Sequence, residues 1–179
     1  MPLTLHPDMV SRKALAAGLG RESEACLHRR HVVALSSGNY VVSSPCWNNV
    51  GAGATDAGAM TWGNGTMGIS GVVSSSNSLV GSTSGDQVGS YGVVALSNGN
   101  YVVISSQWAN VDASATDAGA VTWGSGTTGT SGVGSSSNSL VGSTNDDAVG
   151  SNGVVALSNG NYVVSNPSWG NVGAGATNA

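Results

Sequence analysis

Apolar residues in this chain occur in short runs that are separated by glycine, serine and asparagine. The run Val-Val-Ala-Leu at 93–96 is followed by Ser97-Asn98-Gly99, and a second apolar run covers 100–104. Two β-branched runs joined by an Asn-Gly pair predict a β-hairpin, with a tight turn that requires positive φ at both central residues.

These runs do not alternate between apolar and polar residues. Val93-Val94 and Val102-Val103 place apolar side chains on both faces of the predicted strands. A strand that is apolar on both faces has to be covered on both faces. We therefore expect each hairpin to be packed between two neighbouring sheets.

Two further strands follow in the same segment. Ala-Gly-Ala-Val-Thr-Trp at 118–123 ends at a glycine-rich turn, and Asn-Ser-Leu-Val-Gly-Ser at 138–143 lies beyond a Ser/Gly-rich link. The sequence thus predicts a four-stranded antiparallel meander, with strands near 93–96, 100–105, 118–123 and 138–143.

The whole pattern is repeated along the chain. Leu35, Leu96 and Leu157 each begin a similar sequence segment, and they are spaced 61 residues apart. A fixed period of this size predicts a repeat architecture in which one unit stacks on its copies. We expect unit 1 at 32–92, unit 2 at 93–153 and a partial unit 3 at 154–179. Residues 1–31 are predicted to be a non-repeat basic segment, partly helical (near 9–17 and 22–27) or disordered.

Charge divides the chain in the same way. All five Lys and Arg residues precede residue 31, and the charged residues of the repeats are Asp only. A surface without cations repels phosphate, so we expect no nucleic-acid partner. No apolar run approaches the length of a membrane span, so we expect no membrane insertion. The segment 14–20 after Arg12-Lys13 is too short to make a convincing signal peptide.

The chain has two cysteines, Cys26 and Cys46. Cys46 aligns with Gln107 and Ser168 in the other units, so the repeat does not require sulfur there. We expect two incidental thiols, with a Cys26–Cys46 bridge or a metal site as the alternatives. No cysteine or histidine spacing favours zinc.

The candidate functional residues are tryptophans and aspartates. The tryptophans could form a row of platforms that stack on sugars, although packing between units is the interpretation we favour. They are Trp47, Trp62, Trp108, Trp123 and Trp169. Asp56 and Asp117 recur in one turn, and Asp86 and Asp147 in another. Paired carboxylates can hydrolyse glycosides, but beside Ser, Thr and Gly we expect them to cap backbone amides.

The unit resembles the FG-GAP repeat of integrin-α-type β-propellers. Residues 88–92 (Val-Gly-Ser-Tyr-Gly) stand near the Phe-Gly opening, 96–100 (Leu-Ser-Asn-Gly-Asn) stand at the turn, and 118–121 (Ala-Gly-Ala-Val) stand near the third strand. Ser44-Pro45 and Asn166-Pro167 stand near the Gly-Ala-Pro end. The resemblance covers residues 32–179, approximately. The sequence of the units is also similar to that of tandem arrays in large bacterial surface proteins of the haemagglutinin or adhesin type. Many FG-GAP turns bind calcium through carboxylates, but this turn has none, so we expect no calcium site.

The predicted fold is therefore all-β, with propeller-like blades in an incomplete ring, because a propeller closes with about 4 to 8 blades. A parallel β-solenoid is the alternative. The expected function is that of a non-enzymatic repeat module, a structural scaffold or an adhesion surface. A β-solenoid adhesin stalk and a carbohydrate-active propeller enzyme are the alternatives. The repeats contain no Lys, Arg or His to activate a nucleophile, and we expect no catalytic residue, cofactor or metal.

The expected location is extracellular or on a cell surface, as part of a longer protein. The expected partners are further repeat units or copies of the same chain, bound through open blade faces that carry apolar side chains. Surface glycans and proteins are further candidates.

Overall fold

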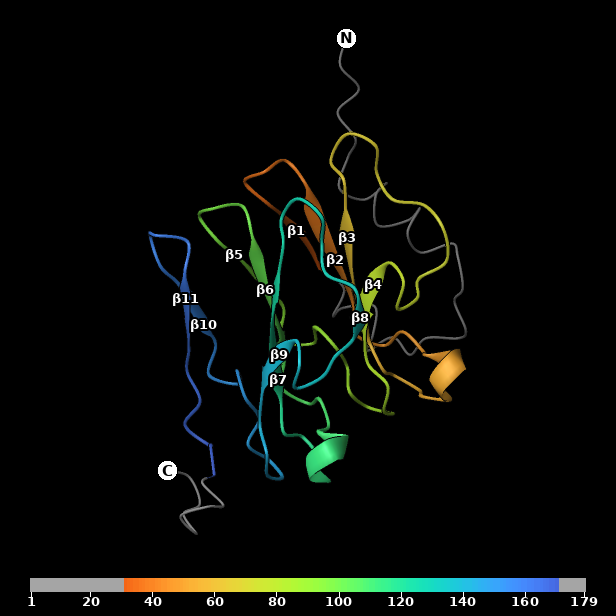
Figure 1. Cartoon of the computed structure of the whole chain (residues 1–179), viewed down its shortest axis with the longest axis vertical. Helices are drawn as coiled ribbons and strands as arrows, with labels where there is room; N and C mark the ends of the chain where they lie inside the picture. The colour runs from red at the N-terminus through yellow and green to blue at the C-terminus, as the bar shows by residue number, and fades with distance from the viewer. Residues whose placement is uncertain (1–30, 171–179) are drawn as a thin grey trace.

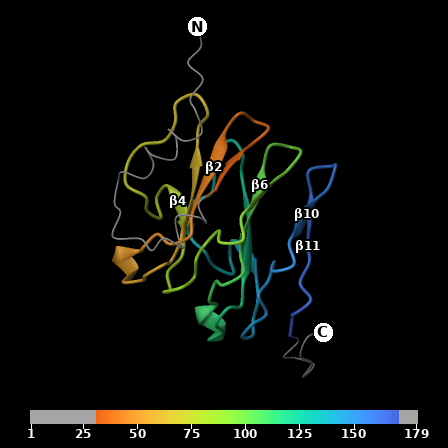
Figure 2. The same ribbon diagram turned by 180° about the vertical axis from the view of Figure 1, so that it is seen from behind.

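The computed structural model describes residues 31–170, and residues 1–30 and 171–179 lie outside the described part, as do the helices predicted near 9–17 and 22–27. Three β-sheets stand side by side in chain order (Figure 1). The hairpin loops gather at one end of this stack, and two short 3-10 turns lie at the other end (Figures 1 and 2). None of the sheets closes on itself.

The strands follow the 61-residue period. Unit 1 contributes β1 (Val32–Ala34), β2 (Tyr40–Ser44), β3 (Ala59–Gly63) and β4 (Ser78–Val80), with the 3-10 turn η1 (Val50–Ala52) between β2 and β3. Unit 2 contributes β5 (Val93–Ala95), β6 (Tyr101–Ser105), η2 (Val111–Ala113), β7 (Ala120–Gly124), β8 (Gly132–Val133) and β9 (Ser139–Val141). The partial unit 3 contributes β10 (Val154–Ala156) and β11 (Tyr162–Val164).

The antiparallel meander is confirmed. In unit 2 the sheet order is β5-β6-β7-β9, and all of its pairings are antiparallel. Unit 1 has the same order in β1-β2-β3-β4. The fold is thus all-β, open and propeller-like, and the parallel β-solenoid alternative is wrong.

The hairpin turn differs from the one expected. Leu96 N–H donates to Asn100 O at 2.8 Å, which leaves the three-residue loop Ser97-Asn98-Gly99 between the strands. Gly99 has a φ of +87°, whereas Asn98 is absent from the residues with positive φ. The turn is therefore a three-residue loop that ends in a left-handed glycine, the next most common hairpin connection after the two-residue loop.

The strand β8 was not predicted from the sequence. It lies in the Ser/Gly-rich link of unit 2 and pairs parallel to β4 of unit 1, with Leu79 opposite Gly132 and Val80 opposite Val133. Beyond it, Gly134 N–H donates to Val80 O at 3.0 Å. Unit 2 thus extends the sheet of unit 1 by one strand, and the two units are linked through their backbones.

The apolar character of both strand faces follows from the stacking. Tyr101 and Val103 of β6 belong to a core cluster between units 1 and 2, together with Met60 and Leu79 of unit 1. The alternate residues of β6, Val102 and Ile104, belong to a second cluster, against which Tyr162 and Val164 of unit 3 pack. All five residues of β6 are buried for this reason.

Cys46 forms a disulfide bond. The expectation of an incidental thiol at this position is therefore wrong. Cys26, the other cysteine of the chain, lies outside the described residues. Because Cys46 has no sulfur-bearing counterpart in units 2 and 3, this bond is a feature of unit 1 alone.

Within residues 31–170 no helix is long and apolar enough to cross a membrane.

Candidate functional site

Asp86 connects unit 1 to unit 2 through its carboxylate. Its Oδ2 accepts hydrogen bonds from the N–H groups of Ser82 and Thr83, both at 2.9 Å, and its Oδ1 accepts one from Ala109 N–H at 3.0 Å. The carboxylate is fully buried. The expectation that this aspartate caps backbone amides is confirmed, and one of those amides belongs to the next unit.

Asp147 forms the same connection one period later. Its Oδ2 accepts from the N–H groups of Ser143 and Thr144, and its Oδ1 from Gly170 N–H at 2.8 Å. The hydroxyl of Thr144 adds a further hydrogen bond to Oδ1. One type of contact therefore joins unit 1 to unit 2 and unit 2 to unit 3.

The two carboxyl groups differ in acidity. Burial raises the pKa of Asp86 above its ordinary value, and the three N–H donors only partly oppose that effect. Burial acts on Asp147 in the same direction, but the hydrogen bonds from Thr144, Gly170 and Ser143 outweigh it and lower the pKa. The additional bond from the Thr144 hydroxyl distinguishes Asp147 from Asp86.

Asp56 and Asp117 have a different role. Both lie exposed in the left-handed region, with φ of +50° and +49°, a conformation that Asp tolerates better than most residues. Their backbone carbonyls accept hydrogen bonds from Gln87 N–H and Ala148 N–H. They help to fold the turn through their backbone, and no side-chain cap is seen at either position.

The glycine that follows two residues later permits a close approach of backbone to backbone. At Gly119, with a φ of +78°, a Cβ atom would lie 2.1 Å from Val149 N. Gly58 is in the same situation beside Val88 N. The Asp-Ala-Gly sequence of units 1 and 2 is thus explained by a turn that packs against the segment leading into the next unit.

The tryptophans predicted to stack on sugars differ in how much of their surface is exposed, and they fall into three groups. Trp108 is buried between units 1 and 2, with 3% of its surface exposed, so its ring offers no free face. Trp47 and Trp62 are half-buried. Trp123 and Trp169 are 46% and 41% exposed. A role of these residues in stacking on sugars stays a prediction.

Trp62 and Trp123 occupy equivalent positions but have different surroundings. Nε1 of Trp62 donates to Gly126 O of unit 2 at 3.2 Å, and Gly129 lies against the same indole ring. Asn39 donates to the same Gly126 carbonyl at 2.7 Å. Unit 2 thus covers Trp62 with its glycine-rich turn, whereas Trp123 is left exposed.

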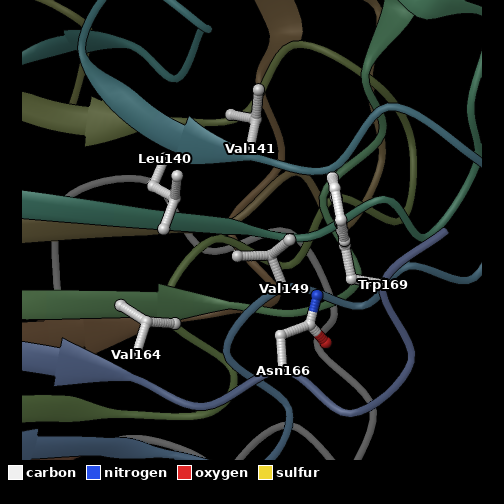
Figure 3. Close-up of a pocket in the computed structure, with 6 residues that line it drawn as sticks. All are labelled: Leu140, Val141, Val149, Val164, Asn166 and Trp169. Carbon is white, nitrogen blue, oxygen red and sulfur yellow. The ribbon is translucent and has the colours of Figure 1, made fainter. Parts of the chain in front are cut away.

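A hollow of about 300 Å³ lies between unit 2 and unit 3. Leu140 and Val141 of β9 lie on one side, Val164 and Asn166 lie on the other, and Val149 and Trp169 lie between them (Figure 3). The amide nitrogen and oxygen of Asn166 are buried without a hydrogen-bond partner. The hollow is the candidate site of the described part of the chain.

The aspartates do not assemble an active site in this structure. Asp86 and Asp147 lie in successive junctions between units, and backbone amides occupy their oxygens. Among residues 31–170 no group of three or more His, Cys, Asp and Glu side chains could hold a metal ion. The sequence indicated Trp169 as a candidate site residue but did not indicate Leu140 or Asn166. The available signal for those two was their position 61 residues after Leu79 and Ser105 of the preceding unit.

The fold and its junctions define the protein as an all-β tandem-repeat protein, in which open blades stack through recurring contacts. A family described as a repeat of unknown function (DUF5650) matches residues 34–90, 95–151 and 156–179. These three matches cover more than half of the chain and begin 61 residues apart, so the chain belongs to this repeat family.

No curated protein matches the chain. No solved structure matches it either.

Proposed function

We propose that the chain is a non-enzymatic repeat module of a secreted or cell-surface protein, where it acts as a scaffold or an adhesion surface. The observation that carries this proposal is the recurrence of one junction, in which the buried Asp of one unit binds a backbone amide of the next. Such a junction allows copies to be added in line, since each unit contacts only its neighbours. An extended stack of this kind suits a structural role.

One further observation supports an extracellular location. Cys46 is in a disulfide bond, and disulfides persist mainly in oxidising compartments. The absence of Lys and Arg from the repeats bears on the partner and not on the location, since such a surface disfavours nucleic acid. Kinship with the FG-GAP blades of bacterial surface proteins is part of the proposal, and the order of the four antiparallel strands supports it.

Labelling of intact cells tests the location. An antibody raised against the repeats should bind the surface of intact cells that make the protein, or the protein should be recovered from their medium. Labelling that appears only after lysis, with none of the protein in the medium, would contradict the proposal.

A substrate panel tests the absence of catalysis. We expect no turnover of glycosides or esters, because backbone amides occupy the carboxylate oxygens of Asp86 and Asp147, and because residues 32–179 contain no Lys or His to activate a nucleophile. The proposal fails if the panel gives turnover that Asp117→Asn abolishes while the variant still melts like the parent chain.

A further inference from the structure

Each residue around the hollow has a buried counterpart 61 residues earlier. Leu140 is 56% exposed, whereas Leu79 is 1% exposed, and Trp169 and Trp108 differ in the same way. The hollow is lined by Leu140, Val141, Val149, Val164, Asn166 and Trp169. Their buried counterparts are, in the same order, Leu79, Val80, Val88, Val103, Ser105 and Trp108. The hollow is therefore the place where a filled junction between two units would have its core.

The structure also identifies what fills the equivalent place between units 1 and 2. Ala120 of β7 belongs to the core cluster there, and β8 pairs with β4 beside Leu79 and Val80. The turn between β7 and β8 covers Trp62 through Gly126 and Gly129. The filling is one continuous stretch of the repeat, residues 118–134.

In unit 3 the receiving groups for such a stretch are unoccupied among the described residues. β11 pairs only with β10, whereas β6 pairs on its other side with β7 across five residues. β9 has β7 as its neighbour and lacks the parallel partner that β8 provides for β4. The side chains of Trp123 and Leu140 are likewise exposed to solvent. The side-chain amide of Asn166 is buried and has no hydrogen-bond partner among the described residues.

We propose that the free edge of β11, the hollow and the outer edge of β9 form an acceptor site for a further copy of the repeat stretch equivalent to residues 118–134. The stretch would add one antiparallel strand to β11 and one parallel strand to β9, with Leu140 opposite the counterpart of Gly132. Its glycine-rich turn would cover Trp123. The proposal rests on the role as a repeat module but not on the location of the protein.

A synthetic peptide with the sequence of residues 117–134, labelled with a fluorophore, tests the site on the 179-residue chain. Its anisotropy should rise saturably as the chain is added. Leu140→Asp should weaken this binding about tenfold or more, because Leu140 would lose its apolar contact with the peptide. Val155→Asp is the matched control, since Val155 lies on β10, which β11 separates from the acceptor edge, and is 61% exposed.

A control peptide with Ala120→Asp should not bind, because its carboxylate would enter the hollow. The proposal is overturned if the parent peptide shows no saturable binding, or if Leu140→Asp and Val155→Asp affect it equally. Quenching of tryptophan fluorescence by an oligosaccharide, without peptide binding, would also overturn it and would favour a sugar site.

A chain lengthened by a copy of residues 119–153 after Ala179 provides a second measurement. In that chain Leu140→Asp should lower the melting temperature, while in the 179-residue chain the same change should leave it nearly unaltered. Equal effects in the two chains would overturn the proposal. Failure of surface labelling would contradict only the proposed location, so the two outcomes remain distinguishable.

Discussion

Replacing Asp86 by alanine should lower the free energy of unfolding by about 3 kcal/mol or more. The substitution leaves the N–H groups of Ser82, Thr83 and Ala109 without their acceptor. A buried donor that loses its partner costs about 1–3 kcal/mol, and these three part-buried hydrogen bonds belong near the lower end of that range. The raised pKa of Asp86 indicates that burying the carboxylate is itself costly, which offsets part of the loss. Urea titration followed by circular dichroism measures the difference.

Two variants control this experiment. Asp112→Ala removes the same side chain from an exposed position in η2 and should change the stability by less than about 0.5 kcal/mol. Asp86→Asn should fall between the two, because the amide retains one oxygen but presents an NH₂ group to a donor. If Asp86→Ala were as mild as Asp112→Ala, the carboxylate would not be what joins the units.

Replacing Tyr101 by alanine should lower the free energy of unfolding by about 3–5 kcal/mol, the range found when a large buried aromatic side chain is removed. Tyr101 is 1% exposed, and its ring packs against Gly124 so closely that a Cβ atom there would lie 2.2 Å away. Its hydroxyl oxygen accepts a hydrogen bond from Thr130 N–H at 3.1 Å. Burial raises the pKa of Tyr101 to about 12, against the opposing effect of that bond.

The repeat supplies a matched control for Tyr101. Tyr162 has the same place in unit 3 but is only half-buried, because the described part of unit 3 contains no third strand. Tyr162→Ala should therefore cost about half as much or less in the same urea titration. Equal costs for the two variants would mean that the cover provided by a complete unit does not determine the contribution of this tyrosine.

Much of the fold could be predicted from residues close together in the sequence. The hairpins follow from β-branched runs around Ser-Asn-Gly, and the stacking follows from strands such as Tyr101–Ser105 that are apolar on both faces. The role of Asp86 as an amide cap follows from its turn of Ser, Thr and Gly. These features were accessible because each depends on local backbone preference or on the simple need to cover apolar surface.

The candidate site was less predictable. Leu79 and Leu140 lie in nearly identical sequence segments, yet Leu79 is buried and Leu140 is mostly exposed. The difference arises from β8, a Gly-Val pair whose pairing with β4 has no local signal, since glycine carries no side chain to reveal a strand. A disulfide bond at Cys46 was only an alternative to the incidental thiol that the sequence favoured, because spacing along the chain does not reveal which thiols meet.

The sequence by itself determined the period, the antiparallel units and the need for neighbours on both sides of each sheet, because hydrophobic pattern and turn residues act within a few positions. Only the tertiary structure decided that Asp86 binds Ala109 of the next unit, that β8 crosses to β4, and that Leu140 lines a hollow while Leu79 lies in a core. Those outcomes depend on which segment lies beside each residue in space. Nearly identical local sequences therefore have different environments, because the described part of unit 3 supplies fewer strands than unit 2 does.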